Sequence, residues 1–196
     1  MAHDYSLDSD GPTSNQRRPQ YAREDTWIRA LLHRGQVAHI GTRWDEQPFV
    51  TPTSYYYDEA AQRLIFHSNI TGRLRANIER HPQVSAEVSE MGRVLPSNIA
   101  IEFSLQYRSV MVFGPARVIT RVEEQTLALH ALIAKYFPEL EPGREYRPVT
   151  EKELKRTSVY ALQIESWSGK ENWKEQADQS EEWPALDKRF HSGAAR

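Results

Sequence analysis

The sequence predicts an α+β fold in which about six antiparallel strands form a closed or partly closed β-barrel with helices at its edges. Short segments rich in β-branched and aromatic residues fill the middle of the 196-residue chain, and only three segments show helical periodicity. The connections between the first strands are too short for crossover helices, so these strands should be antiparallel.

The ordered region is expected to open with a helix and a run of strands. The segment DTWIRALLHRG places Trp27, Ile28, Leu31 and Leu32 on one face and ends at Gly35, which is typical of a helix stop. Four strands bounded by Asp, Glu, Asn or Pro are then predicted at residues 36–43, 48–58, 63–68 and 83–90.

The second half begins with the long β segment IAIEFSLQYRSVMVFGPARVIT, whose Gly-Pro pair at 114–115 favours a bulge or bend. An amphipathic helix follows, because Leu129, Leu132, Ile133 and Tyr136 recur at i, i+3, i+4 and i+7. The segment SVYALQIESWSG predicts one final strand.

Both ends of the chain are polar. Residues 1–22 are rich in Ser, Asp, Asn, Pro and Arg, which indicates a flexible leader before a domain at residues 23–170. Residues 171–196 form a polar tail that carries Trp173 and Trp183. Because large aromatic side chains usually pack against something, we expect this tail to dock on the body or on a partner subunit.

Composition excludes several classes of protein. The net charge of −2 gives no electrostatic case for nucleic acid or an anionic membrane, and no apolar run approaches a transmembrane length. The start of the chain has no apolar signal region, so a cytoplasmic protein is expected. The chain has no cysteine and its seven histidines are scattered, so neither a thiolate site nor another metal site is predicted. GxGxxG, P-loop, HExxH and GxSxG motifs are also missing.

One segment, HSNITGRLRANIERHPQV, places bases where a helix favours acids. A helix is predicted from Thr71 to before Pro82, and its first turn carries Arg73 and Arg75 next to the positive end of the dipole. These arginines are either solvated side chains, at a cost of about 0.3–1 kcal/mol each, or part of an anion site. In the second case an anion would approach the free N–H groups beside Gly72.

Four segments in order, VTPTSYYYD, LIFHS, NITGRLRANIERHPQV and YRSVMVFGPARVI, resemble the pyridoxamine 5'-phosphate oxidase-like flavin-binding superfamily. The nearest branch resembles the nitroimidazole-resistance (Nim) type, and the similarity spans roughly residues 24–170. It implies a Greek-key split β-barrel homodimer with FMN in a cleft at each subunit interface. FAD or the deazaflavin F420 are the alternative cofactors.

The resemblance also implies which residues contact the flavin. The residues that would contact the flavin ring are Pro52, Thr53, Ser54 and Tyr55. Those that would lie beside the ribityl chain and phosphate are His67, Ser68, Thr71, Gly72 and Arg73. Other parts of the cofactor would contact Ser109, Trp167 and Lys170. Where the family often has Gly-Arg-Lys, this chain has Gly-Arg-Leu, so Arg75 is the candidate for the missing cation. The alternatives are that His67 is a structural histidine and that Ser109 only fills a barrel strand.

The leading functional hypothesis is a flavin-dependent oxidoreductase that acts on a small planar substrate, with His67 as a proton donor. A non-enzymatic flavin- or haem-binding protein is the alternative, as is an F420- or FAD-dependent reductase of the same fold. Pyridoxamine-phosphate oxidase activity itself is not favoured, because no R-x-H-x-R segment is recognisable. The homodimer interface is expected to bury more than about 2,000 Å² in total, with Val110, Val112 and Phe113 as apolar side chains along one of its strands.

Overall fold

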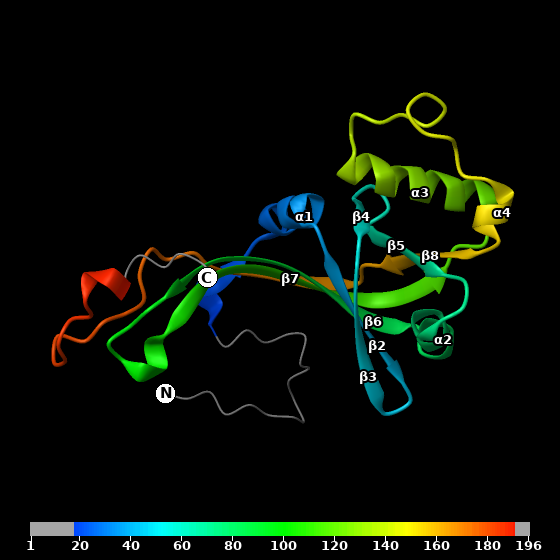
Figure 1. Cartoon of the computed structure of the whole chain (residues 1–196). Helices are drawn as coiled ribbons and strands as arrows, with labels where there is room; N and C mark the ends of the chain where they lie inside the picture. Colours follow the sequence, from blue (N-terminus) through cyan, green and yellow to red (C-terminus); the bar gives the residue numbers. More distant parts are fainter. Residues whose placement is uncertain (1–17, 191–196) are drawn as a thin grey trace.

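A computed structural model of the chain describes residues 18–190, so most of the predicted leader and the last residues of the predicted tail lie outside the described part (Figure 1). The helices are α1 (Asp25–Arg34), α2 (Arg73–Arg80), α3 (Val122–Tyr136) and α4 (Glu151–Leu154), with 3-10 turns at Pro19–Tyr21, Ala100–Glu102 and Lys188–Phe190. None of the helices in the described residues is long and apolar enough to span a bilayer.

The strands are β1 (Ala22–Arg23), β2 (Ala38–Trp44), β3 (Gln47–Thr53), β4 (Tyr55–Asp58), β5 (Arg63–Asn69), β6 (Gln83–Leu95), β7 (Ser104–Val118), β8 (Thr157–Gln163) and β9 (Ser166–Asn172). They form one sheet in the order β3-β2-β6-β7-β8-β5-β4, and β9 pairs with β7 and β1. Every pairing between these strands is antiparallel, which confirms the predicted α+β class.

The prediction of six strands is corrected to nine, because two of the predicted strands are each broken in two. Ser54 separates β3 from β4, and residues 164–165 separate β8 from β9. The ninth strand, β1, lies at the predicted boundary between leader and domain, and its Ala22, the last residue assigned to the leader, pairs with Lys170 of β9. The hydrogen-bonded path of strands is open between β3 and β4, although these two strands are consecutive in the chain.

The bend predicted at the Gly-Pro pair is present in β7. Residues 107–113 of β7 pair with β9, whereas residues 116–118 pair with β8. Gly114, at φ +157°, lies between the two stretches, and a Cβ atom there would be 1.9 Å from the carbonyl oxygen of Gln163. Only glycine allows the main chain of β7 to pass this close to the β8–β9 corner.

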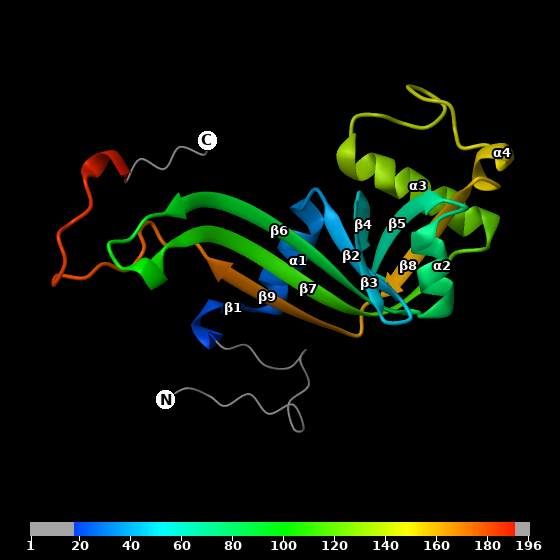
Figure 2. The same ribbon diagram turned by 60° about the horizontal axis from the view of Figure 1, so that its bottom comes forward.

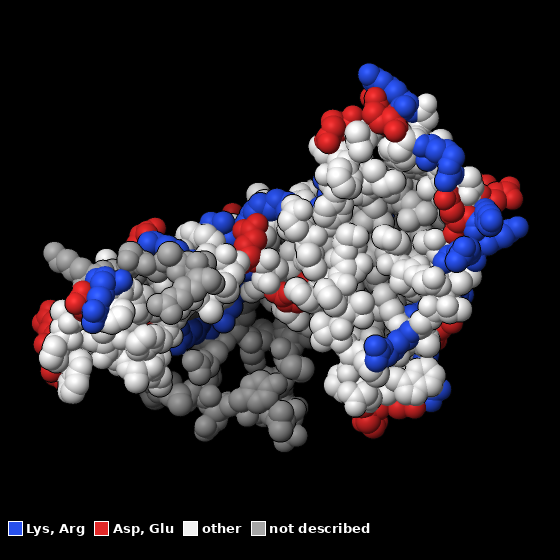
Figure 3. All heavy atoms as spheres, in the orientation of Figure 1, with Lys and Arg blue, Asp and Glu red and all other residues white. Residues whose placement is uncertain are grey.

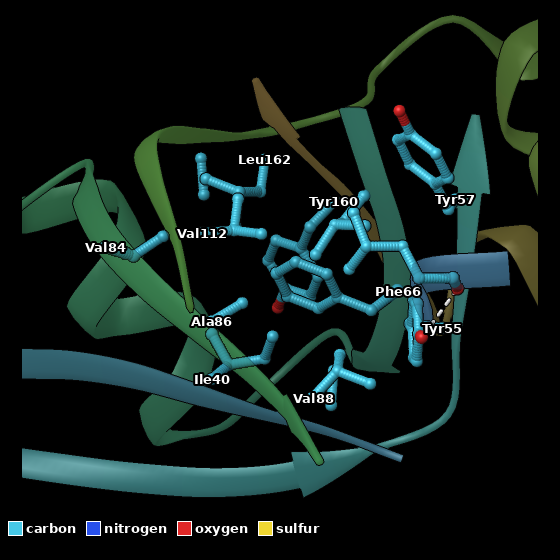
Figure 4. Close-up of a cluster of buried hydrophobic side chains, with 14 of the residues drawn as sticks. Ile40, Tyr55, Tyr57, Phe66, Val84, Ala86, Val88, Val112, Tyr160 and Leu162 are labelled. Atoms are coloured by element: carbon cyan, nitrogen blue, oxygen red, sulfur yellow. Dashed lines mark hydrogen bonds between the residues drawn. The ribbon is translucent and has the colours of Figure 1, made fainter. Parts of the chain in front are cut away.

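Apolar side chains are buried on both faces of β5 and β8. Phe66 stacks on Tyr160 with ring centroids 5.1 Å apart inside the curved sheet, together with Ile40, Val88 and Val112 (Figure 4). On the other face, a second cluster packs under α3 and contains Ile65, Ile119, Ala128, Leu132 and Val159. Strand alternation therefore sends successive residues of β5 to opposite sides of the sheet.

The core also corrects the predicted dimer contacts. Val110 and Val112 are fully buried in the chain's own core, so neither can contribute to an interface. Met111 and Phe113 alternate with them along β7 and lie half-buried on the opposite face of the strand.

Beyond the body, β6 and β7 continue as a long arm (Figures 1 and 2). Charged side chains fix its base: Arg108 donates to Glu171 at 2.6 Å and to Glu90 at 3.3 Å, Arg23 also binds Glu171, and Arg34 of α1 binds Glu90. This chain of ion pairs connects α1 with strands β1, β6, β7 and β9.

The residues after β9 lie along the arm. Trp173 stacks under the Arg108 guanidinium at 3.9 Å, and Gln106 donates to the carbonyl of Lys174 at 2.9 Å. Near the tip, the Asn98 side chain accepts from the Ser180 N–H at 2.8 Å and donates to the Ser180 carbonyl at 2.9 Å.

The close approach at Gly114 gives the first prediction. Gly114→Ala should lower the free energy of unfolding by about 3 kcal/mol or more, since a new Cβ would overlap a main-chain oxygen that cannot move aside. Gly143→Ala is the matched control: Gly143 also has a positive φ, +86°, but a Cβ there meets nothing within 4 Å. For the control we expect the free energy of unfolding, measured by urea denaturation, to fall by only about 1 kcal/mol. Equal losses would show that the contact with Gln163 is unimportant.

Candidate functional site

The turn between β5 and α2 has an uncapped helix start. The Asn69 side chain accepts hydrogen bonds from the Thr71 N–H at 3.1 Å and from the Thr71 hydroxyl at 3.2 Å. Gly72, rather than Thr71, is the N-cap residue, so α2 begins two residues later than predicted, at Arg73. No side chain caps this helix, and a Cβ on Gly72 would meet nothing within 4 Å, so the first N–H groups of α2 border open space.

The two arginines of this turn have different surroundings. Arg73 lies over the ring of Phe49 at 4.8 Å and makes no ion pair with a carboxylate of the described residues. Arg75, in contrast, donates to Glu79 at 2.8 Å and to the hydroxyl of Ser158 at 3.2 Å. Arg75 is therefore already engaged within the chain, whereas Arg73 has no carboxylate partner in the described residues and is the better candidate to contact an anion.

Helix α2 is held firmly behind this turn. Leu74 and Ile78 are buried, and the buried Asn77 side chain donates to the Thr42 hydroxyl of β2 at 3.0 Å. Leu74, at the position where the family often has a lysine, packs into the core and presents no side chain to the open start of α2.

A second group of predicted residues lies at the kink between β3 and β4. Pro52 and Thr53 end β3, and Ser54 forms the break before Tyr55. The Tyr55 side chain is fully buried, and its hydroxyl donates to the Leu32 carbonyl at 2.7 Å. In the single chain the Tyr55 side chain is therefore part of the core and does not line an open site.

Two residues of α3 fix this kink from outside. The Tyr136 hydroxyl accepts from the Tyr55 N–H at 3.0 Å and donates to the Gln36 carbonyl at 2.7 Å. The Lys135 ammonium lies 3.4 Å from the centre of the Tyr55 ring and donates to the Gly35 carbonyl at 2.7 Å. Burial lowers the pKa of Lys135 to about 8.

The structure separates His67 from Ser68. The Ser68 hydroxyl turns toward the core and contacts the Tyr160 hydroxyl at 2.8 Å. His67 points to the opposite face of β5, where it is exposed beneath α3, and burial of part of its ring lowers its pKa. Because Phe66 pairs with Tyr55, His67 comes next to the Ser54 kink.

A pocket of about 330 Å³ opens on this side of β5. Its lining comes from β5, α3, the connection to α4, α4 itself and the start of β8: His67, Leu129, Leu132, Ile133, Tyr146, Arg147, Val149, Glu153 and Thr157. Sequence reasoning missed this pocket, since the apolar face of α3 was interpreted only as core. The unassigned 137–149 connection, with Tyr146 and Arg147, was the available signal.

The remaining predicted contacts lie elsewhere. Ser109 and Lys170 are direct partners across β7 and β9, on a stretch of sheet that lies away from α2 (Figure 2). The Trp167 indole donates to Asp25 at 2.8 Å and stacks with Arg29 at 4.9 Å, so α1 holds it in place. The chain thus brings together Ser54 with His67, and Ser109 with Lys170, as two separate pairs.

Comparisons with known proteins agree with this fold. The family model described as pyridoxamine 5'-phosphate oxidase matches residues 24–171. The flavocytochrome Anf3 of Azotobacter vinelandii is 28% identical, with a TM-score of 0.76 over 88% of this chain and 78% of that one. No curated protein matches the chain.

Two further solved structures share the fold at lower identity. An FAD and haem binding protein of Mycobacterium smegmatis is 24% identical, with a TM-score of 0.70 over 81% of this chain and 76% of that one. A candidate 5-nitroimidazole antibiotic resistance protein of Bacteroides thetaiotaomicron is 19% identical, with a TM-score of 0.63 over 76% of this chain and 84% of that one.

The lysine at the kink gives a pH prediction. The pKa of Lys135 is about 8 in the folded chain, below its value in the unfolded chain, so the unfolded state binds more protons above pH 8. The free energy of unfolding should therefore rise between pH 7 and 9 in the wild type relative to Lys135→Met. Exposed Lys152 of α4 supplies the control, since Lys152→Met should keep the wild-type pH dependence in urea titrations. Parallel curves for wild type and Lys135→Met would contradict the burial of this ammonium.

Proposed function

Because the chain belongs to the pyridoxamine 5'-phosphate oxidase family, we propose that it is a flavin-binding redox protein of the split-barrel type, with FMN as its cofactor. A bound flavin supplies the electron transfer, and the protein supplies binding, orientation and electrostatics. The observation that carries this proposal is Arg73, a guanidinium without a carboxylate partner in the described residues, at the uncapped start of α2.

The residues of the turn fit a phosphate group. The first N–H groups of α2 and the positive end of its dipole favour an anion, and Gly72 leaves room for it beside the main chain. Arg73 can add charge-assisted hydrogen bonds after leaving Phe49, because a cation–π contact at an exposed site is worth only about 0.5–1 kcal/mol. The kink at Ser54, held by Tyr136, is the place that we propose for the flavin ring.

Substitution of Arg73 tests the phosphate site. Arg73→Ala should weaken FMN binding by about ten- to a hundredfold, because it removes a charge-assisted contact. Riboflavin, which has no phosphate, should bind the wild type more weakly than FMN and be nearly indifferent to the substitution. Arg75→Ala is the matched control and should cost less, since Arg75 is paired with Glu79. If Arg73→Ala weakened both ligands equally, or neither, the turn would not bind phosphate.

We also propose that the protein is a homodimer through the outer face of β6, β7 and β9. This face carries Tyr107, Met111 and Phe113, each half-buried, and Met91, which is 69% exposed. In the view of Figure 3 the uncharged surface lies over the middle of the body, and charged side chains lie at its edges and along the arm. A second copy would place its Ser109–Lys170 pair near the flavin of the first, which the single chain does not do.

Light scattering tests the dimer. The wild type should have twice the mass of one chain at micromolar concentration, and Phe113→Asp should shift it toward one chain, because a charge would enter an apolar interface. Leu127→Asp is the control, since Leu127 is 71% exposed on α3, away from this face. A wild-type mass of one chain would rule out the dimer.

The pocket beside His67 favours a second candidate function, a protein that binds both flavin and haem. An imidazole facing an apolar pocket is a suitable haem ligand, and the name of the Azotobacter relative, flavocytochrome, joins the two cofactors. In this candidate His67 binds iron, whereas in a flavin-dependent oxidoreductase it would be a proton donor to substrate. A lower rate of substrate reduction by His67→Ala than by the wild type, at unchanged flavin affinity, would support the proton-donor role. This measurement does not test whether His67 binds iron.

A further inference from the structure

We propose that the pocket between β5 and α3 binds haem with His67 as the iron ligand and Arg147 as the partner of a haem carboxylate at the pocket mouth. This inference rests on the second candidate function and names the residues of that site. It uses no residue of the α2 turn, so the haemin test of this pocket and the Arg73 test of the phosphate site can fail independently.

His67 differs from the other histidines of the described residues. Each of the other four contacts a carboxylate or a hydroxyl: His33, His39, His81 and His130. His67 alone among them has no hydrogen-bond or ion-pair partner, and its cross-strand neighbour is the fully buried Val159. A neutral imidazole whose nitrogens have no partner within the protein is the ligand that haem iron takes in many proteins.

The walls of the pocket suit a flat apolar ring. Leu129, Leu132 and Ile133 face His67 from α3, and Val149 adds a further apolar side chain. Leu129 and Ile133 are only half-buried in the chain alone, although one side of α3 packs on the sheet. A planar macrocycle inserted edge-on would cover this apolar surface. The pocket has a volume of about 330 Å³, which is typical of a ligand pocket and larger than a packing defect.

At the mouth of the pocket, Arg147 can leave the carboxylate of Glu153 and bind a carboxylate of haem instead. Arg147 donates to Glu153 at 2.7 Å, and its side chain is 62% exposed. Such an exposed ion pair contributes little, so moving Arg147 to a haem carboxylate costs little. Glu153 keeps its hydrogen bonds from the Thr150 N–H and hydroxyl, both 2.9 Å, when Arg147 leaves.

Haemin titration of the full-length protein tests the site through the Soret band. The wild type should bind haemin stoichiometrically at micromolar concentration, and His67→Ala should bind on the order of tenfold or more weakly with a shifted band. Arg147→Gln should bind more weakly with an unshifted band, because the iron ligand is unchanged. His39→Ala, which alters an exposed histidine outside the pocket, should match the wild type.

Two controls separate a lost ligand from a damaged fold. Free imidazole should restore the wild-type Soret band of His67→Ala, and iron-free protoporphyrin IX should bind wild type and His67→Ala alike. Arg73→Ala should bind haemin like the wild type while its affinity for FMN falls, which would show that the pocket and the α2 turn are separate sites. A wild type that does not bind haemin, or a His67→Ala variant with the wild-type affinity and band, would overturn the proposal.

Discussion

At Gly114 the main chain of β7 passes so close to the carbonyl oxygen of Gln163 that no side chain fits between them. This approach lets one strand use two different neighbours, β9 before the bend and β8 after it. Because β8 then pairs with β5, and β5 with β4, the bend turns half of the sheet away from the arm. The turned half is the part that α3 covers, and it carries both the α2 turn and the pocket.

Successive residues of strand β5 place the candidate functional side chains on opposite sides of that sheet. Ser68 turns inward to Tyr160, His67 turns outward beneath α3, and the chain then continues through Gly72 into α2. A phosphate site and an imidazole pocket can therefore lie within a few residues of each other without sharing a side chain. In our proposal, the positive end of α2 and Arg73, which has no carboxylate partner in the described residues, bind the phosphate, and the apolar face of α3 lines the pocket.

Much of the fold could be predicted from local patterns, and the failures have physical causes. Helices α1, α2 and α3 follow from periodicity, and the Gly-Pro bend follows from the missing N–H of proline, whereas the one-turn helix α4 was not predicted. The breaks at Ser54 and at residues 164–165 carry no glycine or proline, so two bent strands were each predicted as one. The inward position of Val110 depends on which face of β7 the rest of the chain covers, which alternation alone does not determine.

The candidate site was predictable only in part for a related reason. The misplaced bases of the α2 turn were visible in the sequence, because the helix dipole makes them unfavourable without an anion. The burial of Tyr55 depends on tertiary packing. The i, i+4 pairing of Arg75 with Glu79 and the opposite orientations of His67 and Ser68 follow from helix and strand spacing, and the sequence analysis missed them. The pocket missed by the sequence needed the 137–149 connection to be placed against β5.

The absorbance spectrum of freshly purified protein, followed by identification of the chromophore released on denaturation, tests the central claim most directly. The account predicts flavin absorption bands and about one phosphate-bearing flavin nucleotide per chain, since the α2 turn is proposed to select for the phosphate. A protein that carries no flavin and takes up none from added FMN, or one that binds riboflavin as tightly as FMN, would contradict it.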